Sequence, residues 1–277
     1  MSAANVEERI ISCRERVNCE AQDMFQAITS YHGESLTLSP RGSPVADRVV
    51  RTFDQRHLSV HRTARYAVMG SFEEALSEVW IVCHGHGQLA ARFLSRFIPI
   101  ERSDRLFVAP EALSRYYLQP PRGGPHAPDS PIGATWMTSE DRDCEIADYV
   151  AYLDLLYDEV FSRVPRETVQ LWTLGFSQGC ATVARWVARG KADPDRIVLW
   201  AGVLPPEMTR EEAAVLSHRT PVTIVLGRQD EFANTDLVTA QEARLGELGL
   251  AHQTIRFDGG HEIVPDVLRR LADSTGR

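Results

Sequence analysis

The sequence predicts an α/β protein with a mainly parallel sheet and helices on both faces. Short apolar runs alternate with helical patterns along most of the chain, and this alternation favours parallel pairing of the strands. Runs such as Val79–Cys83 are continuously apolar, which is typical of strands buried on both faces. The 277 residues are enough for a well-buried core, in one large domain or two small ones.

The N-terminal segment has the pattern of a helix. Apolar residues recur every three to four positions from Val6 to Ile28, with charged residues between them. The segment Gly33–Pro44 contains Ser, Gly and Pro and indicates a linker. We therefore expect a helix and linker over residues 1–45 and a single domain over residues 46–277. A packing strut, a lid and a homodimer contact are all compatible with this helix.

Seven segments after this linker have the pattern of strands. They are Arg65–Met69, Val79–Cys83, Leu106–Ala109, Val169–Leu174, Ile197–Trp200, Val222–Leu226 and Gln253–Phe257. The helical patterns are Gln88–Phe97, Ser139–Val164, Gln178–Arg189, Thr235–Leu248 and Ile263–Leu271. Thr138 and Asp141 indicate a capping box before the second of these helices. Gly190 and Gly249 follow two others, where a glycine commonly ends a helix.

A proline-rich segment interrupts this alternation. Residues Leu113–Thr135 lack periodicity and include five prolines, at positions 120, 121, 125, 128 and 131. We expect a loop over about residues 113–135. A loop of this length in a compact domain is either mobile or covers a site.

Composition and charge exclude several classes of protein. The 30 basic and 38 acidic residues give a net charge of −8, which argues against a nucleic-acid-binding module. An apolar content of 43% excludes a mostly disordered chain. The sequence contains no run of 18 apolar residues, so we predict no membrane-spanning helix. Charged residues near the N-terminus interrupt any apolar core of a signal peptide. Five scattered cysteines form no C-x-x-C pair, so we expect a reducing, cytoplasmic compartment.

The segment Gly175-Phe-Ser-Gln-Gly179 is the first candidate for chemistry. It lies directly after one predicted strand and directly before a helix, which is the context that the G-x-S-x-G motif requires. The sharp turn would expose the Ser177 hydroxyl at the carboxyl edge of the sheet. The alternative is a glycine-rich turn with a capping serine. A serine nucleophile needs a base.

His261 and Asp230 are the candidates for the base and its acid partner. Both follow predicted strands, so both belong at the same carboxyl edge as Ser177. The order serine, aspartate, histidine is that of α/β-hydrolases. Glu231 and Asp258 are rivals for the acid. The alternatives are a polar loop residue for His261 and a turn-forming aspartate for Asp230.

The oxyanion of an acyl-transfer reaction would need hydrogen-bond donors at this edge. His84-Gly-His-Gly87 follows another predicted strand, and we expect the backbone N–H groups of His86 and Gln178 to be the donors. A metal site at His84 and His86 is the alternative. No acidic or cysteine cluster joins the two histidines, so we expect no metal.

Two aromatic residues are candidates for the substrate site. Trp136 and Phe232 follow points where the chain leaves the carboxyl edge of the predicted sheet. Their position favours a role in substrate binding. Packed aromatic side chains are the equally favoured alternative.

These segments resemble the phospholipase/carboxylesterase family of α/β-hydrolases, which includes acyl-protein thioesterases. The matching residues are His84-Gly-His-Gly-Gln88, Ala109-Pro110, Trp136, Gly175-Phe-Ser-Gln-Gly179, Gly227-Arg-Gln-Asp230 and Gly260-His261-Glu262. The resemblance implies the α/β-hydrolase fold and a cofactor-free serine hydrolase that acts on small esters or thioesters. It also implies a catalytic triad of Ser177, Asp230 and His261.

The sequence departs from the family where the acyl or alcohol part would lie, and the proline-rich loop before Trp136 is one such departure. Glu231 follows Asp230 where relatives often carry proline, and Glu111 follows Ala109-Pro110. The substrate class therefore stays open. An acyltransferase, a lysophospholipase and a non-catalytic binding protein are the alternatives to an esterase or thioesterase.

Overall fold

The computed structural model describes residues 54–73, 75–120, 124–232 and 235–273. The chain divides into two compact units, Met1–Thr63 and Ala64–Arg277. The described part of the first unit, residues 54–63, contains no helix or strand. The helix predicted near the N-terminus lies outside the described residues, and the predicted domain boundary at residue 46 stays a prediction.

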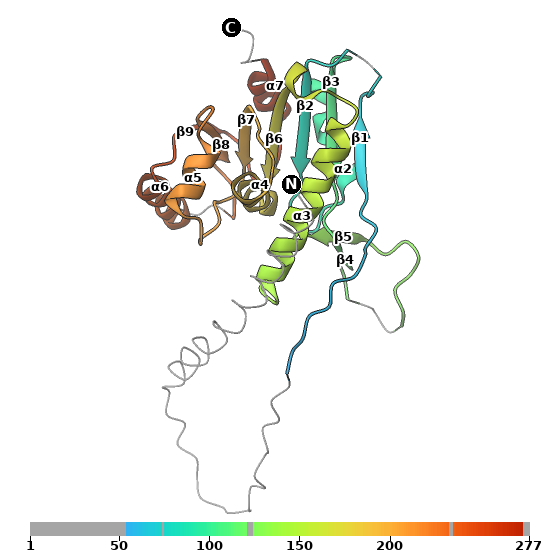
Figure 1. Cartoon of the computed structure of the whole chain (residues 1–277). Coiled ribbons are helices and arrows are strands. Elements are labelled where there is room, and N and C mark those ends of the chain that lie inside the picture. Colours follow the sequence, from blue (N-terminus) through green and yellow to red (C-terminus); the bar gives the residue numbers. More distant parts are fainter. Residues whose placement is uncertain (1–53, 74, 121–123, 233–234, 274–277) are drawn as a thin grey trace, which may run out of the picture. The chain divides into compact units, whose positions relative to one another are not determined.

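The second unit is built on a seven-stranded sheet with the order β1-β3-β2-β6-β7-β8-β9 (Figure 1). The strands are β1 Tyr66–Met69, β2 Glu78–Cys83, β3 Arg105–Pro110, β6 Gln170–Phe176, β7 Arg196–Trp200, β8 Val222–Gly227 and β9 His252–Phe257. The edge strand β1 runs antiparallel to β3, and the other neighbouring pairs are parallel. The predicted mainly parallel sheet is confirmed.

Helices cover both faces of this sheet, as predicted. They are α2 Ala90–Leu94, α3 Arg142–Phe161, α4 Gln178–Arg189, α5 Arg210–Leu216, α6 Thr235–Leu248 and α7 Pro265–Asp273, with 3₁₀ turns at Ser95–Ile100 and Arg166–Thr168. Successive residues of a strand point to opposite faces of the sheet, so they belong to two separate hydrophobic cores. Val79 and Ile81 of β2 pack with α3, α4, α5 and α6, whereas Trp80 and Val82 pack with α2 and α7. Within the described residues, no helix is long and apolar enough to cross a membrane.

The proline-rich segment is only partly the loop that the sequence predicts. Ser114–Tyr117 and Ile132–Thr135 form strands β4 and β5, which pair as a separate antiparallel hairpin. The hairpin also reaches the loop after β2, because Gln88 and Ala134 form an antiparallel bridge. A pairing partner distant in sequence therefore stabilises these two short strands.

Two details of the predicted helices are wrong. The capping box before α3 does not form, since Asp141 precedes the helix without a side-chain cap and Thr138 instead donates its N–H to Glu145. Helix α5 is absent from the prediction. It begins with a complete capping box between Thr209 and Glu212.

Candidate active site

The loops after β2, β6, β7, β8 and β9 meet at the carboxyl edge of the sheet. Ser177 stands between β6 and α4 and is partly buried. Its backbone has φ 54° and ψ −117°, a strained conformation for a residue with a side chain. A Cβ on Gly175 would overlap the carbonyl of Gly179, and one on Gly179 would overlap the carbonyl of Cys83. The two glycines thus allow the sharp strand-to-helix turn that the motif predicts.

His261 and Asp230 lie in contact in the loops after β9 and β8. Asp230 Oδ2 accepts a 2.8 Å hydrogen bond from His261 Nδ1, and Asp230 Oδ1 accepts one of 2.9 Å from the Phe232 N–H. The Asp230 side chain is 1% exposed, against 19% for His261. This bond leaves the Nε2 lone pair of His261 available as a base.

The aromatic neighbours of His261 connect it to the serine turn. Its ring lies 5.0 Å from that of Phe176, the residue before Ser177, and 4.7 Å from that of Phe232. The structure therefore places His261 in contact with Asp230 and beside the residue that precedes Ser177. Of the two rival acids, Glu231 is exposed, and Asp258 is 86% exposed and pairs with an arginine.

The glycine-rich loop after β2 lies against the serine turn. A Cβ on Gly85 would come within 3.1 Å of Ser177 Cβ. No hydrogen bond within the described residues engages the backbone N–H of His86 or Gln178. Gln178 begins α4, where unpaired N–H groups and the helix dipole favour negative charge. Both predicted oxyanion donors are thus free to bind a ligand.

His84 has a structural role in this loop. It is fully buried, and burial lowers the pKa of its imidazole. Its Nδ1–H donates to the Gly85 carbonyl at 2.8 Å, and Nε2 accepts the Ala112 N–H at 3.1 Å. Because both ring nitrogens already have partners, His84 offers no lone pair to a metal ion.

Trp136 lies beneath the same loop. Its indole N–H donates to the His84 carbonyl at 2.8 Å, its ring packs edge-on against Tyr149, and only 3% of the residue is exposed. This position matches the alternative of a packed aromatic side chain. Substrate contact by Trp136 stays an untested prediction.

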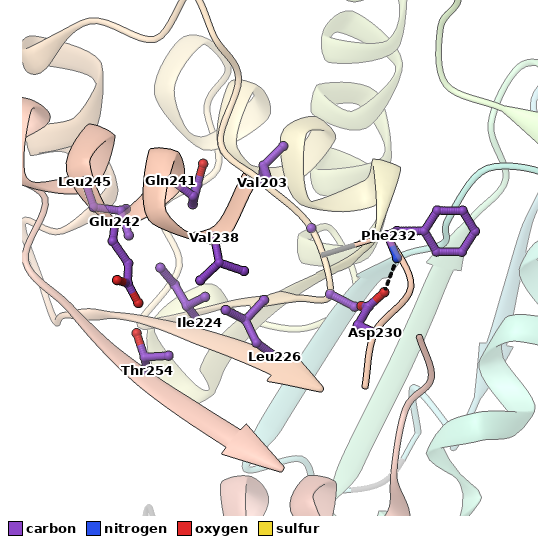
Figure 2. A pocket seen from close by; sticks show the side chains of 12 residues that line it. Val203, Ile224, Leu226, Asp230, Phe232, Val238, Gln241, Glu242, Leu245 and Thr254 are labelled. Carbon is purple, nitrogen blue, oxygen red and sulfur yellow. Dashed lines mark hydrogen bonds between the residues drawn. The ribbon is translucent and has the colours of Figure 1, made fainter. Parts of the chain in front are cut away.

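An apolar pocket of about 510 Å³, counted with the open space at its mouth, lies beside Asp230 (Figure 2). It is lined by Ala201, Gly202, Val203, Ile224, Leu226, Asp230, Phe232, Val238, Gln241, Glu242, Leu245 and Thr254. Gly202 connects the pocket to the serine turn, because a Cβ there would overlap the Ser177 carbonyl. Phe232 is 65% exposed, and its ring points away from the aliphatic walls in Figure 2.

Two polar side chains at this site are not among the residues predicted from the sequence. The Tyr116 hydroxyl lies 2.5 Å from His86 Nε2, and Thr135 Oγ1 lies 3.2 Å from His86 Nδ1. Both belong to the hairpin that was expected to be a loop. The available signal was the aromatic pair Tyr116-Tyr117 in a segment with strand propensity.

A mainly parallel sheet with a strained serine between strand and helix is characteristic of the α/β-hydrolase class. The sequence pattern of the phospholipase/carboxylesterase family matches residues 65–276, so the chain belongs to this family. Membership places it among the esterase-type hydrolases. A comparison with curated protein sequences finds no match.

Solved structures of similar fold agree with this assignment. Acyl-protein thioesterase 2 from Zea mays has a TM-score of 0.55 and 18% identity, over 76% of this chain and 97% of that one. The Bacillus cereus carboxylesterase has a TM-score of 0.53 and 12% identity, over 76% and 92%. The phospholipase/carboxylesterase from Dyadobacter fermentans has a TM-score of 0.51 and 17% identity, over 78% and 98%. At these identities the likeness shows the fold alone.

Proposed function

We propose that the protein is a cofactor-free serine hydrolase that cleaves carboxylic ester or thioester bonds through an acyl-enzyme. The observation that carries the proposal is the bond between His261 Nδ1 and the buried Asp230, at the edge that also carries the strained Ser177. Family membership supports the same class of reaction.

In the proposed mechanism, Ser177 Oγ attacks the acyl carbon while His261 Nε2 takes its proton. Asp230 holds the imidazole in the Nδ1–H tautomer and stabilises the imidazolium that forms. The N–H groups of His86 and Gln178 bind the negatively charged oxygen of the tetrahedral intermediate. The bond to the leaving alcohol or thiol then breaks, and His261 returns the proton to that group. Water repeats the sequence and releases the acid.

The surroundings of the site favour an apolar part of the substrate. Phe232 is exposed beside His261, and the aliphatic pocket begins at Asp230 and Gly202. We therefore place Phe232 among the substrate contacts. The buried cysteines Cys83 and Cys180 form no disulfide, and this favours a reducing, cytoplasmic compartment.

The first test is intact mass after treatment with a fluorophosphonate probe, because it needs no knowledge of the substrate. We expect one adduct on the wild type and none on Ser177→Ala. In a separate rate assay with an ester substrate, Ser177→Ala should lower kcat by about 10⁴-fold or more. A folded wild type that takes no label would instead support a non-catalytic binding protein.

The second test concerns the acid. Asp230→Asn should lower kcat by about 10⁴-fold, because the amide stabilises the wrong tautomer of His261. Asp258→Asn is the matched control, since this rival carboxylate is 86% exposed, and it should keep the wild-type rate. Wild-type rates in Asp230→Asn would assign the acid to another carboxylate.

A further inference from the structure

The loop that carries the proposed oxyanion donor His86 needs external support. Gly87 has φ +75°, a conformation that glycine adopts without steric cost and that lets the chain turn sharply here. The hairpin β4–β5 supplies one tether. The Gly87 N–H donates to the Ala134 carbonyl at 2.8 Å, and the Ala134 N–H donates to the Gln88 carbonyl at 3.2 Å. Gly133 packs so closely on Gly87 that a Cβ would overlap it.

The imidazole of His86 supplies a second tether to the same hairpin. Its Nε2 lies 2.5 Å from the Tyr116 hydroxyl, and its Nδ1 lies 3.2 Å from Thr135 Oγ1. The strand register places Tyr116 opposite Gly133 and Ser114 opposite Thr135, so Tyr116 and Thr135 share one face of the hairpin. The small Gly133 leaves room on that face for the loop.

The hydrogen-bond network around Thr135 fits the Nδ1–H tautomer of His86, which we assign from the acceptors of the Thr135 hydroxyl, the Met137 carbonyl and Gln178 Oε1. The Thr135 hydroxyl donates its single proton to the Met137 carbonyl at 2.9 Å. Its oxygen then accepts from Gln178 Nε2 at 3.0 Å and from the Nδ1–H of His86 at 3.2 Å. His86 Nε2 is left without a proton and accepts the hydroxyl proton of Tyr116. Both proposed oxyanion donors, His86 and Gln178, are therefore tied by their side chains to one threonine.

We propose that Tyr116 and Thr135 are positioning residues that hold the His86 imidazole, and through it the backbone N–H that binds the oxyanion. The proposal rests on the proposed hydrolase function. Oxyanion donors act only when they are fixed at hydrogen-bond distance from the developing charge. Loosening the loop should therefore lower kcat and leave KM nearly unchanged, because the ground-state substrate depends less on this contact.

The decisive comparison is between Tyr116→Phe and Tyr117→Phe. Tyr116→Phe keeps the ring that packs 5.5 Å from His86 and removes only the hydroxyl. Tyr117 lies on the other face of β4, where its ring stacks on His126. With an activated aryl ester as substrate, we expect kcat to fall roughly five- to tenfold in Tyr116→Phe and to stay at the wild-type value in Tyr117→Phe.

Two further readouts separate positioning from general stability. Nitrogen NMR of His86 should show the Nδ1–H tautomer in the wild type and a tautomer mixture in Thr135→Val, which removes the acceptor of the Nδ1–H. Thr135→Val should lower kcat at least as much as Tyr116→Phe, whereas Thr135→Ser, which keeps the hydroxyl, should recover most of the rate.

Several results would overturn the proposal. The first is a wild-type kcat in Tyr116→Phe. The second is an equal loss of kcat in Tyr116→Phe and Tyr117→Phe. The third is a rise in the KM of Tyr116→Phe with no change in its kcat. If the wild type takes the fluorophosphonate label and hydrolyses the ester, these results refute only the positioning role. If the wild type neither labels nor hydrolyses, both the positioning role and the proposed function are wrong.

Discussion

Glu207 joins the loop after β7 to helices α3 and α4, and we predict that Glu207→Gln lowers the free energy of unfolding by about 2–3 kcal/mol at neutral pH. Its carboxylate accepts hydrogen bonds from Arg142 at 2.6 Å and from Arg185 at 2.7 and 3.3 Å. Arg189 lies at 3.4 Å. The Arg185 side chain is 4% exposed, so the substitution leaves a buried guanidinium without its charged partner.

The pKa of Glu207 yields the magnitude. Burial raises this pKa, but the hydrogen bonds and charges of Arg185 and Arg142 outweigh burial and lower it from 4.5 to about 2. At about 1.36 kcal/mol per pKa unit, the difference corresponds to roughly 3.4 kcal/mol. The Glu207 side chain is 30% exposed, and solvent screening reduces this value to about 2–3 kcal/mol.

The pH dependence follows from the same pKa. Because the folded-state pKa of Glu207 lies below the unfolded value of 4.5, the stabilisation is complete above about pH 4.5. It is lost as the pH falls toward about 2. Glutamine resembles protonated glutamate, so the difference between wild type and Glu207→Gln should shrink over this range. Urea unfolding of both proteins between pH 7 and pH 3 measures it.

A matched control is Glu159→Gln, which removes an exposed pair with Arg163 at spacing i,i+4. It should change the free energy of unfolding by less than about 0.5 kcal/mol. The reasoning on Glu207 fails if Glu207→Gln behaves like this control, or if its effect is the same at pH 7 and pH 3.

Two other substitutions test the site directly. Gly85→Ala places a Cβ 3.0 Å from a ring atom of Phe176 and 3.1 Å from Ser177 Cβ, so it should displace the serine turn and lower kcat by about tenfold or more; an unchanged kcat in steady-state kinetics would contradict this packing. Phe232→Ala removes an exposed ring beside His261, so it should change the preference for acyl or alcohol groups across a series of esters while Tm shifts by less than about 2 °C; an identical ester profile would exclude substrate contact.

The centre of the sheet was predictable because its inner strands, such as β2, β3 and β6, are buried on both faces. A run such as Val79–Cys83 is apolar at every position. So short and continuous a run favours a buried strand over an amphipathic helix, which is longer and has apolar residues at every third or fourth position. The carboxyl-edge loops follow from the parallel order, which explains why Ser177, Asp230 and His261 could be assigned to one edge. The antiparallel pairing of β1 left no signal, since pairing direction depends on the connection and not on composition.

The hairpin β4–β5 was missed because its signal in the sequence is weak. Each strand has four residues, and their burial alternates only in β4. A pair this short is marginal alone, and its stability comes from the bridge to Gln88 and from the bonds to His86. Such contacts between distant segments leave no periodic pattern in the sequence. The residues missed at the site, Tyr116 and Thr135, are the ones that bond to His86.

Glu111 shows how the structure changes the meaning of a departure from the family. Its carboxylate is 3% exposed and accepts hydrogen bonds from Arg65, Arg115 and the Ala90 N–H. Burial raises the pKa of Glu111, but the two arginines outweigh burial and lower it. Arg65 precedes β1, Arg115 lies in β4, and Ala90 begins α2, so Glu111 connects the sheet edge, the hairpin and the helix that follows the loop after β2.

A buried carboxylate that is fully engaged in this way has no free oxygen for a substrate. The departure at Glu111 therefore concerns the support of the segment around His86, the proposed oxyanion donor. The departure at Glu231 lies in the loop that carries Asp230, next to the exposed ring of Phe232. Differences in substrate choice between this protein and its relatives should accordingly map to the loop after β8.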